Sequence, residues 1–372
     1  MKETPLTRLA AGSEEVRETK GTLHTPGEIL QQPWLWRETA GRVAALRDRA
    51  EAVMKGAEFA VLTGAGSSLH AARLMEDAGR ARLGTAVSSV SCTELMLSPE
   101  AFIPRNRKGV LISLSRSGES PESVEAARIV AERFPQVGHL AITCNGEGTL
   151  AKRVQARPDG VCLALHPKSY DKGLGTTSSM TSTVVAGRLM LDPSGASRLE
   201  ALAKAGEGVL ADAERAETDA SSDPSRVVVL GTGPLEAAAQ EGAHKILELT
   251  DGQVTSMARS CLEFRHGPIA FAEEGTLLIG LVSPDPLVRR YDMDFLAQAV
   301  RMPVRKVVPF DVSERFASLK SGEVGVLGVV FCQMLALFLS LRRGLRPDRP
   351  GARGLVNPIV QGVTIHPREE TS

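Results

Sequence analysis

The sequence carries no net charge, because its 372 residues include 44 Lys and Arg against 44 Asp and Glu. It therefore lacks the excess of basic residues that attracts nucleic acids and anionic membrane surfaces. Aromatic residues make up only 4% of the chain, too few to form a stacking platform for single-stranded bases. We accordingly expect neither a nucleic acid nor a membrane among its partners.

Cysteine is also scarce. The five residues are spread along the chain, and no two have the spacing of zinc ligands: Cys92, Cys144, Cys162, Cys261 and Cys332. An odd and scattered set is typical of reduced thiols, and it favours a cytoplasmic protein over a secreted one. Because no group of His, Cys and Asp in the sequence has the spacing of a metal site, we expect no metal and no other cofactor.

The sequence has no long and unbroken apolar segment. The longest apolar run, from about Val324 to Leu341, is interrupted by Gly328 and Gln333 and is followed by two arginines. This pattern favours a buried helix over a membrane span. The segment 322–341 is interpreted as the strand-to-helix end of the second domain. The first 21 residues are polar and charged, which indicates a loose segment and no signal peptide.

From about residue 57, apolar strand patterns alternate with helical ones. Strands are predicted at 59–63, 110–114, 138–143 and 161–165, and again at 226–230, 276–282 and 304–309. Such alternation predicts an α/β fold with two tandem domains, each a doubly wound, mainly parallel sheet flanked by helices.

The same pattern divides the chain into five parts. These are an N-terminal arm with helices (1–50), a first α/β domain (51–195), a linker (196–225), a second α/β domain (226–345) and a C-terminal tail (346–372). The two domains open on similar strand–glycine turn–helix units, at Val61 and at Val228, which favours their being duplicates.

Residues with hydroxyl groups gather near the predicted strand ends of the first domain. They form three clusters: Ser67-Ser68, Ser115-x-Ser117-Gly118-x-Ser120 and Thr176-Thr177-Ser178-Ser179. One such cluster would be explained by caps and turns alone, for which Ser and Thr are well suited. Three clusters favour a site that binds a phosphate group and the hydroxyls of a sugar. The reason is that strand–turn–helix units direct backbone N–H groups and the positive end of a helix dipole at one position.

The glycine turns do not fit a dinucleotide. The third glycine of the G-x-G-x-x-G pattern is replaced by Leu69 in the first domain and by Glu236 in the second. A nicotinamide cofactor is therefore not expected.

Two further groups of residues have side chains suited to proton transfer. Glu241, Lys245 and Glu248 are spaced i, i+4, i+7 and so share one helix face. They are explained either by surface salt bridges or by a carboxylate base beside an ammonium. His266, which precedes a Gly-Pro pair, is either a turn histidine or an acid–base group for opening a sugar ring.

These residues stand in motifs of fixed order. Three of these motifs resemble the sugar isomerase (SIS) domain family, which includes the isomerase half of glucosamine-6-phosphate synthase. They are Glu241-Gly242-Ala243-x-Lys245-x-x-Glu248, Glu263-x-x-His266-Gly267-Pro268 and Ser115-x-Ser117-Gly118-Glu119-Ser120. The sequence is most similar to the D-galactosamine-6-phosphate deaminase/isomerase group, also described as tagatose-6-phosphate ketose/aldose isomerases, in four segments: Thr25–Trp36, Ser115–Ser123, Thr177–Ser182 and Val360–Pro367. The likeness covers nearly the whole chain after residue 22.

The resemblance implies roles for individual residues. The phosphate would be held by Ser67, Ser68, Ser115, Ser117, Gly118 and Ser120, and the sugar would be contacted by Thr176 and Ser178. Glu248 would move a proton between C1 and C2, while Glu241 and Lys245 position the sugar and its developing charge. His266 would open the ring, in a site completed by the other subunit of a homodimer.

The resemblance also implies the reaction, in which an amino-hexose 6-phosphate (galactosamine 6-phosphate or glucosamine 6-phosphate) becomes a ketohexose 6-phosphate and releases ammonia. The alternatives are an aldose–ketose isomerase without deamination, a glutaminase-less aminotransferase-like SIS enzyme, and a non-enzymatic sugar-phosphate-binding regulatory module. Two departures argue against amino transfer. Lys2 stands where a glutaminase needs a nucleophilic cysteine, and the tail, with Asn357, Gln361 and His366, has no lysine to form an imine.

Overall fold

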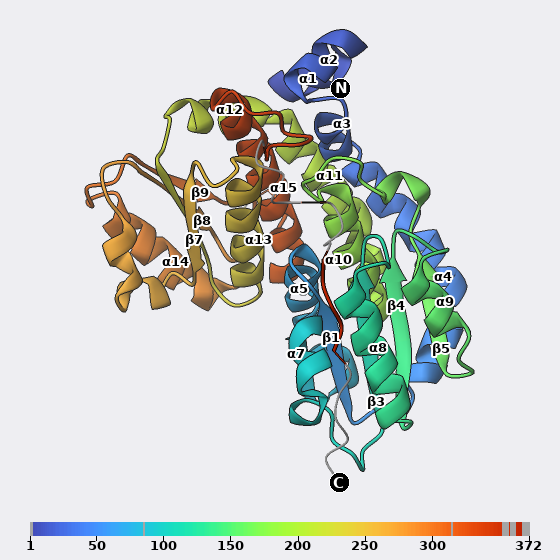
Figure 1. Cartoon of the computed structure of the whole chain (residues 1–372). Helices are drawn as coiled ribbons and strands as arrows, with labels where there is room; N and C mark the ends of the chain where they lie inside the picture. Colours follow the sequence, from blue (N-terminus) through green and yellow to red (C-terminus); the bar gives the residue numbers. More distant parts are fainter. Residues whose placement is uncertain (1–2, 85, 314, 352–356, 358–361, 367–372) are drawn as a thin grey trace.

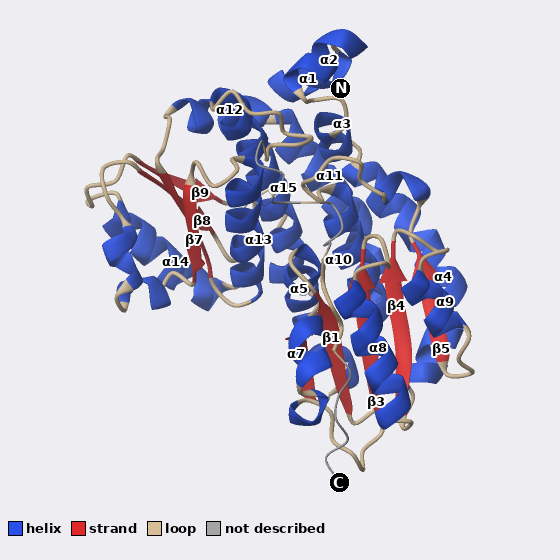
Figure 2. Cartoon of the chain, viewed as in Figure 1, coloured by secondary structure: helices blue, strands red, loops and turns tan. Residues whose placement is uncertain are grey.

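The computed structural model describes residues 3–84, 86–313, 315–351, 357 and 362–366. These residues form two parallel β-sheets, each with helices on both faces, and further helices that pack between the sheets (Figure 1). Figure 2 shows the two sheets in red, well separated, with the helices in blue around them. We refer to the first sheet with its helices as the first half of the molecule, and to the second sheet with its helices as the second half.

The strands of the first sheet are β1 (Phe59–Gly64), β2 (Ala86–Ser91), β3 (Gly109–Ser115), β4 (Val137–Thr143) and β5 (Gly160–Ala164). Those of the second are β6 (Arg226–Gly231), β7 (Thr255–Arg259), β8 (Thr276–Leu281) and β9 (Lys306–Phe310). The strand orders are β2-β1-β3-β4-β5 and β7-β6-β8-β9, and every neighbouring pair is parallel. Every residue of β1, β3 and β4 is buried, because these central strands are covered on both faces. The predicted α/β fold with two doubly wound parallel sheets is confirmed.

All the predicted strands are present except one in the segment 322–341, and two strands were missed. β2 and β7 lie at sheet edges and expose residues along much of their length, so no apolar run marks them in the sequence. The prediction of a strand before the helix at 322–341 is wrong, because residues 321–342 form one continuous helix.

The N-terminal segment is helical. Its helices are α1 (Pro5–Ala11), α2 (Glu14–Lys20), α3 (Thr25–Leu30) and α4 (Gln32–Met54). The prediction that the first 21 residues are loose is therefore wrong for α1 and α2. A reciprocal cap explains α1, because the N–H of Thr7 donates to the Thr4 hydroxyl at 3.2 Å and the N–H of Thr4 donates to the Thr7 hydroxyl at 2.8 Å.

The helices of the first half are α5 (Ser67–Arg73), α6 (Glu76–Leu83), α7 (Cys92–Leu97), α8 (Pro121–Arg133), α9 (Thr149–Gln155) and α10 (Ser178–Leu191). Those of the second half are α13 (Pro234–Leu249), α14 (Pro286–Ala299) and α15 (Ser321–Arg342). Between them, within the segment expected as a linker, lie α11 (Leu199–Ala211) and α12 (Ala213–Ser221). Because α11 packs on α4 and α12 on α15, this segment contributes to the core.

Helix α15 is the central helix of the molecule. It packs along α13 and also contacts α10, α11 and α12. Its length and composition would suit a membrane span, but 94% of its most apolar window is buried inside the protein, as in the predicted core helix. Gln333, the polar interruption of the apolar run, accepts a hydrogen bond from Gln32 at 2.9 Å and donates one to the carbonyl of Thr177 at 3.2 Å. This amide therefore links α15 to the start of α4 and of α10.

A glycine allows α13 and α15 to pack closely, since a Cβ added at Gly242 would lie 2.6 Å from the Sγ of Cys332. We expect Gly242→Ala to lower the free energy of unfolding by about 1–3 kcal/mol through overpacking. The control is Gly41→Ala, because Gly41 lies inside α4 with open space at its Cβ position. That variant should be more stable by roughly 0.5–1 kcal/mol. Urea unfolding measures both, and equal shifts would contradict the close contact.

Candidate active site

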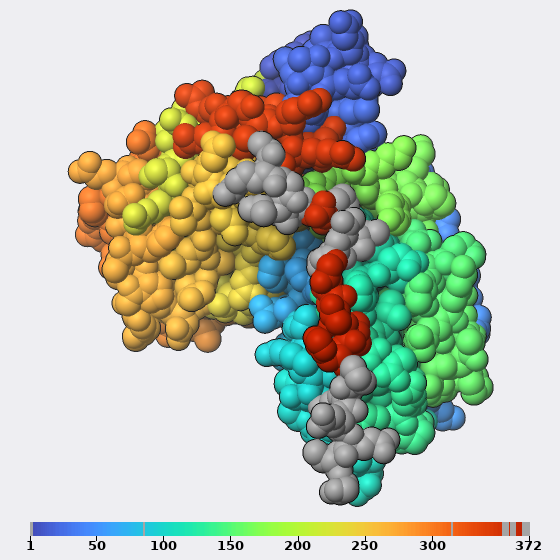
Figure 3. Space-filling model, viewed as in Figure 1, coloured from blue at the N-terminus to red at the C-terminus, as the bar shows by residue number. Residues whose placement is uncertain are grey.

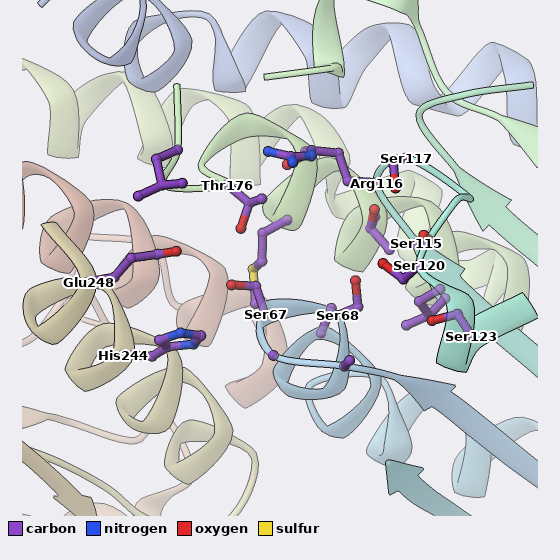
Figure 4. Close-up of a pocket in the computed structure, with 18 of the residues that line it drawn as sticks. Ser67, Ser68, Ser115, Arg116, Ser117, Ser120, Ser123, Thr176, His244 and Glu248 are labelled. Atoms are coloured by element: carbon purple, nitrogen blue, oxygen red, sulfur yellow. The ribbon is translucent and has the colours of Figure 1, made fainter. Parts of the chain in front are cut away.

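A cavity of about 250 Å³ lies between the carboxyl ends of β1 and β3 and the helix α13 of the second half (Figure 4). His244 and Glu248 line it from α13. Hydroxyl groups of turns and of helices α5, α8 and α10 line it from the first half, together with one arginine: Ser67, Ser68, Ser115, Arg116, Ser117, Ser120, Ser123, Thr176, Ser179 and Thr183. The fold thus brings the predicted base to the predicted phosphate turns.

The turn between β3 and α8 forms one wall of the cavity. Gly118 adopts a φ of +70°, a conformation that favours glycine, and its N–H donates to the Ser115 hydroxyl at 2.9 Å. The N–H of Glu119 donates to the Ser117 hydroxyl at 3.2 Å. Ser120 occupies the N-cap position of α8, where its hydroxyl accepts no capping hydrogen bond from the helix, and it lines the cavity. The positive end of α8 therefore meets the cavity among three serine hydroxyls.

The turn after β1 and the side chain of Arg116 complete this wall. Ser67 and Ser68 begin α5 directly after Gly66, which has a φ of +54°. Arg116 lies across the cavity from them, and its guanidinium is 5.7 Å from the ring centroid of Tyr170 (Figure 4). It adds a permanent positive charge whose planar donors suit a phosphate. Arg116 was not predicted as a cavity residue, although its position inside the 115–120 serine cluster could have indicated it.

Asp171 holds the loop that leads into α10. Its carboxylate accepts hydrogen bonds from the N–H of Thr177 at 2.8 Å and from the N–H and hydroxyl of Ser179 at 2.8 and 2.7 Å. It also accepts one from the hydroxyl of Ser178. Ser178 therefore turns towards Asp171 and does not line the cavity, whereas Thr176 does. Of the two predicted sugar contacts, the structure brings only Thr176 to the cavity.

Glu28 of α3 supports the same loop from its outer side. Its carboxylate accepts hydrogen bonds from the N–H groups of Lys172 at 2.6 Å and Gly173 at 3.2 Å. Burial and the neighbouring Asp171 raise the pKa of Glu28 to about 8. The loop that carries Thr176 thus depends on a buried acid from the N-terminal helices.

Lys245 is fully buried between two carboxylates of α13. Its Nζ forms an ion pair with Glu248, lies 3.7 Å from an oxygen of Glu241 and donates to the Thr176 hydroxyl at 3.4 Å. Burial alone would lower the pKa of Lys245, but Glu248 and Glu241 outweigh burial and raise it. A charged ammonium therefore stands beside the Glu248 carboxylate at the cavity wall. The interpretation of this stripe as surface salt bridges is wrong.

Glu241 lies behind the cavity wall and joins the two halves. Its Oε2 is 2.8 Å from Nδ1 of His70, on α5, and 3.9 Å from Nδ1 of His244. Burial alone would raise the pKa of Glu241, but Lys245 and the His70 hydrogen bond lower it to about 2, so the carboxylate stays ionised. Burial lowers the pKa of His244, which favours its neutral imidazole. Sequence spacing could not place His70 here, because it belongs to the other half of the chain.

His266 lies apart from this cavity. It is exposed between the short 3₁₀ turns η4 (Glu263–Arg265) and η5 (Pro268–Phe271) of the second half and does not line the cavity. Its role in a site completed by a second subunit stays a prediction.

Two of the three tail residues singled out in the sequence are described. Asn357 lines the cavity, and His366 lies in segment 362–366, which runs over the surface of the first half (Figure 3). Gln361 lies outside the described residues.

No family model matches the chain. It is 34% identical over 359 residues to the D-galactosamine-6-phosphate deaminase AgaS of a Shewanella species, with 93% of this chain and 92% of the relative covered. It is 37% identical over 367 residues to a Streptomyces coelicolor protein that bears the same name provisionally, with 92% and 95% covered. The chain belongs to the AgaS family. Its motifs thus indicated the correct group of sugar-phosphate proteins.

A solved structure supports the fold of this AgaS-family chain. The crystal structure of tagatose-6-phosphate ketose/aldose isomerase from Escherichia coli matches it with a TM-score of 0.84 and 28% identity. The match covers 92% of this chain and 96% of that one. The resemblance to that group, drawn from the motifs, is therefore confirmed along nearly the full length.

The buried acid of this AgaS-family chain predicts a pH dependence of stability. Because folding raises the pKa of Glu28 from its ordinary value of 4.5 to about 8, the folded state holds a proton that the unfolded state has lost between these values. The stability of the wild type should therefore fall, on the order of a few kcal/mol, as pH rises from 4.5 to 8. Glu28→Gln cannot ionise and should show a flatter profile of Tm against pH.

The control for this measurement is Glu18→Gln, which neutralises an exposed acid of α2 and should leave the profile unchanged. An identical slope in the wild type and Glu28→Gln would contradict a protonated acid at this position.

Proposed function

We propose that this chain converts an amino-hexose 6-phosphate to a ketohexose 6-phosphate and ammonia, with galactosamine 6-phosphate as the first candidate substrate. One observation carries the proposal: Glu248, from the second half, lines the same cavity as the serine turns of the first half (Figure 4). A base and a phosphate site in one cavity are what proton transfer along a phosphorylated sugar requires. The names of the AgaS relatives point to an amino sugar as the substrate.

The phosphate would bind at the serine side of the cavity. The positive end of α8, the hydroxyls of its turn and the Arg116 guanidinium all favour a dianion there. Ser67 and Ser68 approach the same space from α5. Thr176 lies between this wall and Glu248, where it would contact a hydroxyl of the sugar (Figure 4).

The chemistry would then occur at C1 and C2 of the opened sugar. Glu248 removes the proton from C2, the electron pair forms a C1–C2 double bond, and the C1 oxygen takes up a proton. Return of a proton to C1 leaves an imine at C2. Water adds to the imine carbon, the carbon–nitrogen bond breaks, ammonia leaves, and C2 becomes the ketone. The Lys245 ammonium, held beside Glu248, would stabilise the negative charge that develops on the C1 oxygen.

Aldose–ketose isomerisation without deamination is the second candidate. The E. coli structure with that name shares the fold over nearly the whole chain. The same proton transfer by Glu248 would serve a substrate that carries a hydroxyl on C2, because only the fate of the C2 substituent differs. The two reactions are distinguished by whether ammonia appears with the ketose.

We further propose that the protein works as a cytoplasmic homodimer with shared sites. The exposure of His266, away from the cavity of its own chain, leaves it available to a second chain. Leu262, in the same loop, is also exposed, with 37% of its surface accessible. The five cysteines are buried and form no disulfide, which suits a reducing compartment.

Glu248→Gln tests the assignment of the base. The amide cannot accept the C2 proton, so kcat for ammonia release should fall by about a hundred- to ten-thousand-fold. KM should change little, because the serine turns remain. Wild type and variant are assayed with hexose and amino-hexose 6-phosphates for ammonia and for ketose.

The matched control is Glu236→Gln, which removes a carboxylate from the same helix outside the cavity and should keep full activity. Ammonia release by Glu248→Gln at the normal rate would mean that another group is the base. Ketose without ammonia from the wild type would favour the isomerase.

Co-expression of two inactive variants tests the shared site. In a mixed dimer of Glu248→Gln and His266→Asn chains, one of the two sites combines an intact Glu248 with an intact His266 from the partner. Random pairing should then restore about a quarter of the wild-type activity. If His266 acted within its own chain, the mixture would remain as inactive as each variant alone.

A further inference from the structure

A group of three side chains behind the cavity wall forms a second potential site. His70 comes from α5 of the first half, and Glu241 and His244 come from α13 of the second. Their potential ligand atoms all lie within 4.8 Å of one another. The reaction proposed above uses neither histidine.

We propose that His70, Glu241 and His244 bind one divalent transition metal ion of the zinc type. Two imidazoles and one carboxylate form a common set of protein ligands at zinc sites that keep an open position. Calcium and magnesium prefer oxygen ligands, of which this group offers only one carboxylate. The two ligands on α13 are spaced i, i+3, so they project from one face of the helix.

The separations of the ligand atoms fit such an ion. Oε2 of Glu241 lies 2.8 Å from Nδ1 of His70 and 3.9 Å from Nδ1 of His244. Two ligands that each bind zinc at about 2.05 Å in tetrahedral geometry are roughly 3.3 Å apart, between these two values. The two rings stand nearly perpendicular, with centroids 5.5 Å apart. Small side-chain adjustments would therefore form the site without moving either helix.

Two of the buried polar atoms in this group have unused bonding capacity. Nδ1 of His244 and Oε1 of Glu241 form no hydrogen bond within the described part of the chain. Buried polar atoms are nearly always paired, because leaving them unpaired costs free energy. A metal ion at this position would engage the ring nitrogen and the carboxylate together.

Lys245 is the feature that opposes a cation here. Its Nζ lies 3.7 Å from Oε1 of Glu241, and it will reduce the affinity. The same ammonium is paired with Glu248, however, so the three charged groups Lys245, Glu241 and Glu248 together carry one negative charge. The local charge therefore still attracts a divalent ion.

The position of the site means that a bound ion would connect the two halves of the molecule. One ligand belongs to the first half and two belong to the second, so the ion would bridge α5 and α13. His244 also lines the sugar cavity, which places the ion at the cavity edge, one helical turn from Glu248 (Figure 4). An ion bound only to the folded chain raises its stability.

The test measures metal binding by the full-length protein. The protein is dialysed against EDTA and titrated with Zn²⁺ in competition with a chromophoric chelator, and Tm is recorded with and without Zn²⁺. We expect one equivalent of Zn²⁺ per chain and a higher Tm. His70→Ala and His244→Ala should each weaken binding at least about tenfold. The control His366→Ala removes an exposed histidine outside the group and should bind as the wild type does.

Co²⁺ provides a second readout, since its visible absorption bands report ligation directly. The bands should appear with the wild type and be lost in both histidine variants. If an alanine variant does not fold, judged by circular dichroism, the corresponding glutamine variant replaces it. The absence of a bound equivalent would overturn the proposal. An equivalent retained by both variants would also overturn it and would mean an adventitious ion only. Because the readout is binding and not turnover, the result is independent of the proposed sugar-phosphate activity.

Discussion

A lysine ammonium buried between two carboxylates is the interaction on which the site depends. Removing an ammonium from water costs several kcal/mol unless the protein supplies opposite charges, and Glu248 and Glu241 supply them here. The ion pair fixes Glu248 at the cavity wall, and the same Nζ reaches the Thr176 hydroxyl in the other half. Glu248 and the loop that faces it are thus held by one charge. The site would lose its geometry if that charge were removed.

The fold was largely predictable because a strand that is buried on both faces of a parallel sheet consists of a continuous apolar run, which is visible in the sequence. β1, β3 and β4 are wholly buried and were found for that reason. The edge strands β2 and β7 follow a different pattern, since one side of each lacks a neighbouring strand and polar residues are tolerated there. Of the N-terminal helices, α1 and α2 were missed because they are short and polar, and a reciprocal threonine cap is a weaker signal than an apolar stripe.

The site was predictable only in part, because local patterns show which residues share a face but not what that face meets. The serine turns and the stripe through Glu248 are local features, and the structure brings them together. Ser178 shares its cluster with Thr176, but Asp171 binds its hydroxyl instead. His70 and Glu241 are 171 positions apart, so no spacing rule connects them. Such contacts arise only when the halves pack against each other.

The amide of Gln333 has a consequence for how the protein is made. Its partners, Gln32 and the carbonyl of Thr177, leave the ribosome long before α15 is synthesised. At usual elongation speeds the interval between Thr177 and α15 is on the order of ten seconds. During this time the nascent first half presents the apolar surface that α15 later covers, together with the Gln32 amide and the Thr177 carbonyl that Gln333 later contacts. The cavity can therefore be completed only near the end of translation, and the nascent chain depends most on chaperones just before then.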